Sequence, residues 1–160
     1  MLCIQPDQVK NGRIDHVDIG QAIFIDCSNL INLIELPPWP HVEIVSCINC
    51  SKLTKLPMWP MIKQVFCTGC SLLTQLPCWK LVRVVDLSHC TLIKYLPMWP
   101  LIKRIFCFGC FQLQHVPSNI KVVHINKCPF VLNRAMVTLA KVEYLDTDMR
   151  QVLFKIMYPQ

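Results

Sequence analysis

Apolar and polar residues alternate over short stretches of this chain, and the alternation returns at a regular interval. In E-I-V-S-C, Val45 and Cys47 stand two residues apart with a serine between them, and Val65 and Cys67 repeat the spacing. An apolar residue at every second position is typical of a β-strand with one buried face. Short strands are therefore predicted at these places.

The interval between the predicted strands is twenty residues, and other residue types keep the same step. A unit reads L-P-x-W-P-x-[VI]-x-x-[VI]-x-[CL]-x-x-C-x-x-[LI]-x-x. The residues in step are Leu36, Leu56, Leu76 and Leu96, each before a proline, then Trp39, Trp59, Trp79 and Trp99, and Cys50, Cys70, Cys90 and Cys110. A unit this short cannot bury a hydrophobic face alone, so stacked units must share one core.

The repeat becomes weaker towards both ends of the chain. Near the C-terminus the step shortens to eighteen, so that Val123 matches Ile105. A last, degenerate unit is predicted with Val142 and Leu145 as its apolar positions and Tyr144 as its first outward residue. About seven units over residues 22–147 are expected.

The Leu-Pro-x-Trp-Pro segment predicts how the chain returns between strands. Prolines lack an N–H donor and favour extended backbone before them, so this segment cannot lie inside an α-helix. An extended or 3₁₀ return is expected. Stacked units then place their strands in a parallel sheet, about 4.8 Å apart.

This pattern resembles the leucine-rich repeat, L-x-x-L-x-L-x-x-[N/C]. The matching residues of one unit are Ile62, Val65, Cys67, Cys70, Leu73 and Leu76. The unit length and the L-P-x-W-P return resemble the short repeats of bacterial effectors, and the Cys-x-x-Leu-Thr step resembles cysteine-containing repeats, including those of large DNA viruses. The resemblance implies an α/β repeat fold, with a parallel sheet on the concave face, an extended or 3₁₀ convex side and protein binding on the concave face. The chain has no room for the ubiquitin-ligase domain of the effectors.

A solenoid exposes its core at both ends and needs caps. Residues 1–21 are predicted to form an N-terminal cap, with Asn11-Gly12 as a hairpin turn. Residues 148–160 carry apolar residues at helical spacing and are predicted to form a C-terminal cap helix. A helical turn is expected within 131–141.

The cysteines allow two interpretations. Cys47-x-x-Cys50 and Cys67-x-x-Cys70 are spaced as in a zinc ribbon. One period later, however, Leu87 occupies the first position of the pair, as expected for a core site. A structural role is favoured for the second position, at Cys50, Cys70, Cys90, Cys110 and Cys128, and no metal is expected. Zinc and disulfides are the alternatives.

The four tryptophans also allow two interpretations. Trp39, Trp59, Trp79 and Trp99 could form an exposed aromatic platform for sugars or bases. The favoured interpretation places them in the core on the convex side, where the related repeats carry leucine.

Residues that point outward from the predicted strands form the candidate binding face. Unlike the inward positions, they change type from unit to unit. Protein partners or self-association are expected to use an aromatic and arginine cluster around one aspartate, since aromatic and arginine residues dominate binding hot spots. The predicted residues are Phe66, Asp86, Arg104, Phe106, Phe108, His124 and Tyr144. An ordinary, partly covered sheet surface is the alternative.

Four cations precede the outward row and form a predicted basic edge: Lys63, Arg83, Lys103 and Lys121. A solvated face is the simplest explanation. Regularly spaced cations also attract polyanions, so an acidic protein or a nucleic-acid backbone is the alternative, with or without zinc.

Composition limits the remaining possibilities. Apolar residues make up 53% and charged residues 16% of the chain, so a folded core is expected. The N-terminus does not resemble a secretory signal, and no run of eighteen apolar residues predicts a membrane span. A cytoplasmic protein, in the host cell if viral, with reduced cysteines and no membrane partner is expected.

Catalytic motifs are not found in the sequence. The chain has four glycines and no Gly-rich phosphate loop, G-x-S-x-G or H-E-x-x-H motif. No enzyme activity, cofactor or small-molecule substrate is expected. The favoured function is a non-enzymatic protein-binding module. Polyanion binding and a self-associating structural component of a viral particle are the alternatives.

Overall fold

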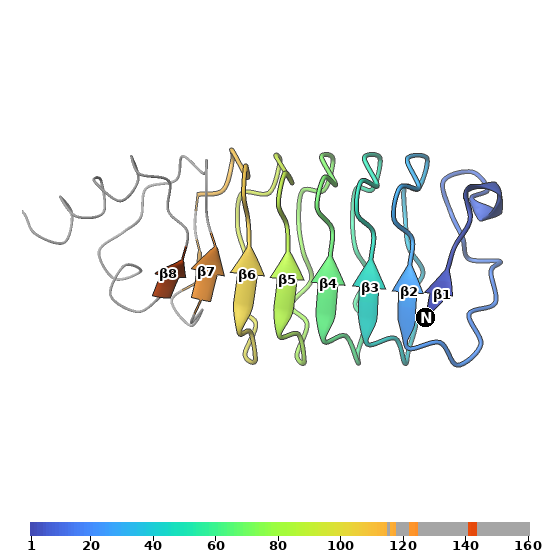
Figure 1. Ribbon diagram of the computed structural model, residues 1–160, viewed down its shortest axis with the longest axis horizontal. Helices are drawn as coiled ribbons and strands as arrows, with labels where there is room; N and C mark the ends of the chain where they lie inside the picture. The colour runs from blue at the N-terminus through green and yellow to red at the C-terminus, as the bar shows by residue number, and fades with distance from the viewer. Residues whose placement is uncertain (115, 118–121, 125–140, 144–160) are drawn as a thin grey trace, which may run out of the picture.

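The chain winds into a solenoid whose coils stack side by side along one axis (Figure 1). This computed structural model describes residues 1–114 and 116–117, together with the strand backbones at 122–124 and 141–143. The strands are β1 (Leu2–Cys3), β2 (Phe24–Asp26), β3 (Ile44–Ser46), β4 (Gln64–Phe66), β5 (Val84–Asp86), β6 (Arg104–Phe106), β7 (Val122–His124) and β8 (Lys141–Glu143).

These strands form one parallel sheet in the order in which they occur along the chain. Val45 lies opposite Val65, and Val65 opposite Val85, so each strand is displaced from the last by one repeat. Ile105 lies opposite Val123, which gives the predicted step of eighteen. The predicted parallel solenoid and the register of its central strands are confirmed.

The register of the last strand differs from the prediction. With Tyr144 as the first outward residue, Leu145 would lie opposite Val123. In the structure Val142 lies there, so the strand is shifted by three residues from the prediction. The sequence K-V-E-Y-L-D offers two successive polar–apolar–polar triplets, and the structure uses the first of them, with Lys141 opposite Val122. Tyr144 lies outside the described residues.

The core runs through the stacked coils as parallel rows of like residues. The central residue of each strand from β2 to β6 is fully buried, because the neighbouring positions point to the other face of the sheet. Three further buried rows follow the strands, at the two cysteine positions and at the leucines or isoleucine three residues later. The residues of one coil are Val65, Cys67, Cys70 and Leu73.

The tryptophans fill the core in the segments that return to each strand. Trp59, Trp79 and Trp99 are fully buried and Trp39 is 6% exposed. Consecutive rings are nearly parallel, with centroids 5.9–6.1 Å apart, an offset stack that suits aromatic quadrupoles. The indole N–H of Trp59 donates to the Pro37 carbonyl of the preceding coil at 2.9 Å. Trp79 and Trp99 repeat this bond at 3.1 and 2.9 Å.

Helix is nearly absent from the described part of the chain. Its one helical element is the 3₁₀ helix η1 (Pro6–Gln8) in the N-terminal segment. The returns of the described coils are extended, as the prolines require, and contain no 3₁₀ turn. The expected α/β character is thus reduced to a parallel β-solenoid. The C-terminal cap helix predicted over 148–160 lies outside the described residues. So does the helical turn expected within 131–141, apart from Lys141, which is the first residue of β8.

The N-terminal segment covers the first coil. Lys10 and Arg13 exchange backbone hydrogen bonds of 2.9 and 3.0 Å. Asn11 and Gly12 between them both have positive φ, as a two-residue hairpin turn of this kind needs. This turn is the predicted one. Strand β1 is an addition that the repeat did not predict, since it pairs with β2 before the repeat begins.

Replacing Trp59 with alanine is expected to lower the free energy of unfolding by about 3–5 kcal/mol, because the change leaves a cavity between two stacked rings. Urea unfolding followed by circular dichroism measures this. Met58→Ala, at a neighbouring side chain that is 55% exposed, is the control and should cost less than about 1 kcal/mol. Equal losses in the two variants would contradict the stacking role of Trp59.

Candidate functional site

The outward side chains of β4, β5 and β6 meet on the solvent-facing side of the sheet. Phe66, Asp86 and Phe106 lie opposite one another in the strand register and are each half-buried. Phe108, two residues beyond Phe106, is also half-buried. Its ring centroid lies 6.5 Å from that of Phe106, at an angle of 49°.

Arg104 extends this cluster at the start of β6. It stands two residues before Phe106, so both side chains point to the same side of the sheet, and Arg104 is exposed. The structure therefore brings Phe66, Asp86, Arg104, Phe106 and Phe108 together on one face. Of the other predicted members, His124 is described only as a strand position opposite Phe106.

Asp86 caps the end of its strand within this face. One of its carboxylate oxygens accepts the backbone N–H of Ser88 at 2.9 Å. Asp26 makes the same bond with Ser28 in the first coil. Both aspartates thus satisfy a donor where the strand ends. The coil does not require an aromatic residue at the position of Phe66, since Asp26 and Ser46 stand there in other coils.

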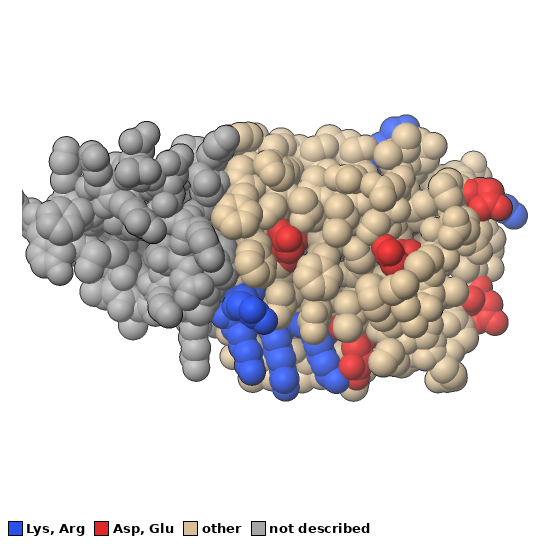
Figure 2. All heavy atoms as spheres, viewed as in Figure 1, with Lys and Arg blue, Asp and Glu red and all other residues tan. Residues whose placement is uncertain are grey.

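The basic edge lies at the amino ends of β4 to β6, where Lys and Arg side chains gather in Figure 2. The Arg83 N–H bonds to the Lys63 carbonyl, and the Lys103 N–H to the Arg83 carbonyl, both at 2.8 Å. Lys63 forms an ion pair of 2.6 Å with Glu43. Arg83, Lys103 and Arg104 have no acidic partner within 4.0 Å in the described part of the chain. Lys121 lies outside it.

The paired cysteines occupy two different environments. The first of each pair, such as Cys47, is a fully buried core residue, and Leu87 replaces it in the next coil but one. The second donates its S–H to a carbonyl of the preceding coil. Cys50 donates to Cys27 and Cys70 to Cys47 at 3.0 Å; Cys90 donates to Cys67 at 3.0 Å and Cys110 to Leu87 at 3.1 Å. Cys128 lies outside the described residues.

These hydrogen bonds require protonated thiols, and at Cys50 burial favours the protonated form. Burial raises the pKa of the Cys50 thiol to about 12 and raises that of Cys27 as well. A zinc site would need thiolates instead. Among the residues described, no group of three or more His, Cys, Asp or Glu side chains is placed to hold a metal ion.

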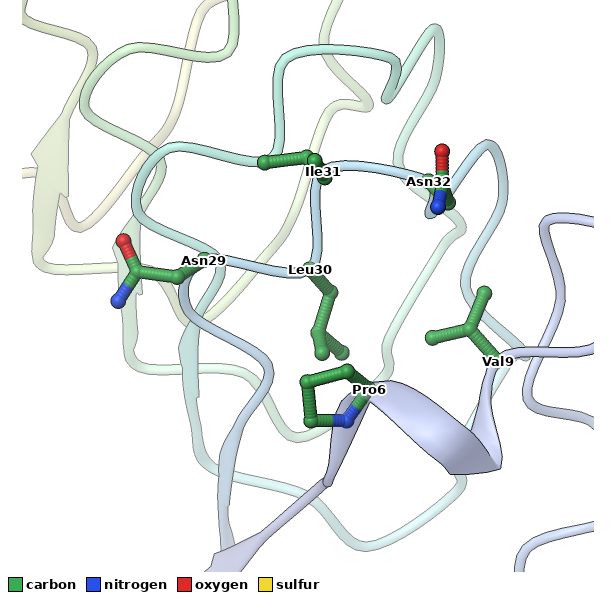
Figure 3. Close-up of a pocket in the computed structure, with 6 residues that line it drawn as sticks. All are labelled: Pro6, Val9, Asn29, Leu30, Ile31 and Asn32. Atoms are coloured by element: carbon green, nitrogen blue, oxygen red, sulfur yellow. The ribbon is translucent and has the colours of Figure 1, made fainter.

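A small cavity lies between the N-terminal segment and the first coil. Pro6 and Val9 line it on one side, and the turn from Asn29 to Asn32 on the other (Figure 3). Its volume of about 70 Å³ is far below the roughly 300 Å³ of a typical small-molecule pocket. In Figure 3 the Leu30 side chain points towards Pro6, so the cavity is a packing gap of the cap.

One row of turn residues was not predicted from the sequence. After each strand, from β2 to β6, one residue has positive φ, and these residues keep the step of twenty: Asn29, Asn49, Gly69, His89 and Gly109. Asparagine and glycine adopt this backbone most readily. Their recurrence at one position of the unit was the available signal. An added Cβ at Gly69 would lie 2.7 Å from the Asn49 Oδ1, so the Asn49 side chain would have to shift to make room for it.

No family profile, curated protein or solved structure matches this chain. Within the described residues, no helix combines the length and hydrophobicity needed to cross a bilayer. The sheet face and the edges of the solenoid are the candidate binding surfaces.

Protein purified without added zinc is expected to contain much less than one zinc per chain, because Cys50 and Cys70 use their protons to bond backbone carbonyls. Elemental analysis by mass spectrometry measures this. One zinc per chain, lost together with the fold on chelation, would overturn the structural role of the cysteines.

Cys27→Val is expected to gain stability relative to the wild type as the pH rises above about 9. A pKa that is raised on folding contributes stability that is complete below the unfolded pKa and is lost as the pH rises towards the folded pKa. The wild type should lose about 1.4 kcal/mol per pH unit for each such thiol. Urea unfolding at neutral and alkaline pH measures the difference. Cys3→Val, at an exposed thiol, is the control, and the same pH dependence in all three proteins would refute the argument.

Proposed function

We propose that this protein is a non-enzymatic binding module, built from short leucine-rich repeats, that recognises a protein partner through its sheet face. The observation that carries the proposal is the half-buried aromatic cluster of Phe66, Phe106 and Phe108 beside Arg104. The coil does not require aromatic residues there, because aspartate and serine fill equivalent positions in other coils. Aromatic and arginine side chains supply most of the binding energy in protein interfaces.

The shape of the face supports a protein partner over a small molecule. The cluster is spread over three adjacent strands, and the described cavities do not involve it. A broad surface with a few large anchors is the usual form of a protein–protein interface.

The assignment to leucine-rich repeats is supported by the cysteine rows. In that repeat the position after the strand carries Asn or Cys, and here its thiol bonds the carbonyl of the preceding coil. The parallel sheet and the extended return agree with the short repeat type. A reducing, cytoplasmic location is supported by the free thiols of the ten cysteines in the described part.

The double variant Phe66→Asp/Phe106→Asp is expected to lose partner binding by at least about a hundredfold, since two anchors become charged groups that would be buried unpaired. Affinity purification with quantitative mass spectrometry identifies partners, and titration with the purified partner measures the loss. Phe111→Asp, at a phenylalanine that is 54% exposed outside the sheet, is the matched control. Circular dichroism must show that all variants fold.

Two outcomes would change the proposal. Equal partner recovery by the double variant and the control would discard the sheet face as the binding site. A dimer seen in sedimentation velocity for the wild type, and abolished by Phe106→Asp alone, would assign the face to a second copy of this chain.

A further inference from the structure

The loops that lead into the strands carry a row of exposed apolar side chains next to the basic edge. Met58, Met61, Met98 and Leu101 are 55%, 41%, 65% and 45% exposed. In the coil between them, Cys78 is exposed and Leu81 is half-buried. We call these six residues the apolar row. Each coil contributes two members, at 58/78/98 and at 61/81/101, and each pair is repeated one period later at the coil spacing of about 4.8 Å.

The fold places these side chains at the surface without any need to bury them. Met58 and Met98 each precede a buried tryptophan, so the core is filled by their neighbours. Met61 and Leu101 lie in the turns just before Ile62 and Ile102, which are 0% and 4% exposed. The apolar row is thus additional to the packing of the coils.

The apolar row and the basic edge share one margin of the solenoid. Met61 and Lys63 flank the buried Ile62, and Leu101 and Lys103 flank the buried Ile102. Because the buried residue points into the core, the residues on each side of it point outward. Figure 2 shows the cations of this margin side by side at the lower ends of β4 to β6. Glu43, paired with Lys63, is an acidic group at one end of the basic edge.

We propose that this margin docks the protein peripherally on a bilayer that contains anionic lipids. Methionine and leucine side chains on projecting loops can enter the interfacial region, while adjacent lysine and arginine side chains bind lipid phosphates and carboxylates. The sequence analysis expected no membrane partner, because no run of apolar residues could span a bilayer. The surface contact proposed here departs from that expectation.

Charge and chemistry favour this occupant over others. A second copy docked margin to margin would bring Arg83 and Lys103 near their own counterparts, and like charges repel. A nucleic-acid backbone would neutralise the cations but would leave the apolar row without a function. An anionic bilayer satisfies both rows in one contact. This inference is independent of the sheet face, which lies on other residues.

Co-flotation with liposomes tests the proposal. We expect the wild type to bind vesicles of phosphatidylcholine with about 30% phosphatidylserine, and to bind pure phosphatidylcholine vesicles at least about tenfold less tightly. Arg83→Glu/Lys103→Glu and Met98→Ser/Leu101→Ser should each reduce binding to the anionic vesicles by at least about tenfold. Binding should also weaken as salt increases.

Matched controls separate the margin from general charge and hydrophobicity. Lys52→Glu/Lys94→Glu makes the same change in net charge at exposed residues outside the sheet, and Leu72→Ser/Phe111→Ser removes two exposed apolar side chains there. Both should bind like the wild type. Because all the substituted side chains are exposed, the melting temperatures should stay close to that of the wild type, and comparing them checks this.

Three results would overturn the proposal. The first is no binding of the folded wild type to anionic vesicles. The second is an equal loss of binding in the margin and control variants. The third is binding to duplex DNA that depends on Arg83 and Lys103 but not on Met98 and Leu101, which would assign the basic edge to nucleic acid.

Discussion

The structure depends on side-chain donors that reach from one coil to the carbonyls of the coil before it. After the strands the donor is a thiol, and before them it is an indole. The thiols are those of Cys50, Cys70, Cys90 and Cys110, and the indoles are those of Trp59, Trp79 and Trp99. A buried carbonyl without a donor is costly, so these bonds fix the length and register of each coil from two sides. The zinc-like spacing of the cysteines is a consequence of this repeat.

Much of the fold could be predicted because the inward positions obey a rule that every coil must meet. A residue such as Val65 has only apolar equivalents, since one continuous core passes through all the coils. The last strand could not be placed, because K-V-E and Y-L-D satisfy the same rule and only the neighbouring strand selects between them. Strand β1 was missed for the opposite reason: it belongs to no repeat, and its pairing with β2 leaves no periodic signal.

The functional surface could be predicted only in outline. The alternation of the strands tells which residues point outward, and the structure brings Phe66, Phe106 and Phe108 to one face as expected. The alternation does not predict that the Asp86 carboxylate accepts the Ser88 N–H, because this bond depends on the turn after the strand. The apolar row was overlooked because Met58 and Met98 adjoin the tryptophans and, in the sequence, look like part of the same core segment.

The thiol bonds of Cys50, Cys70, Cys90 and Cys110 and the indole bonds all have one direction, since each donor points to a coil nearer the N-terminus. During synthesis the ribosome releases that end first. Each new coil therefore emerges when the carbonyls that its cysteine and tryptophan need are already held in place by the folded coils before it. The chain can grow vectorially on its own end, adding one coil at a time, and the hairpin cap at Asn11-Gly12 supplies the starting surface.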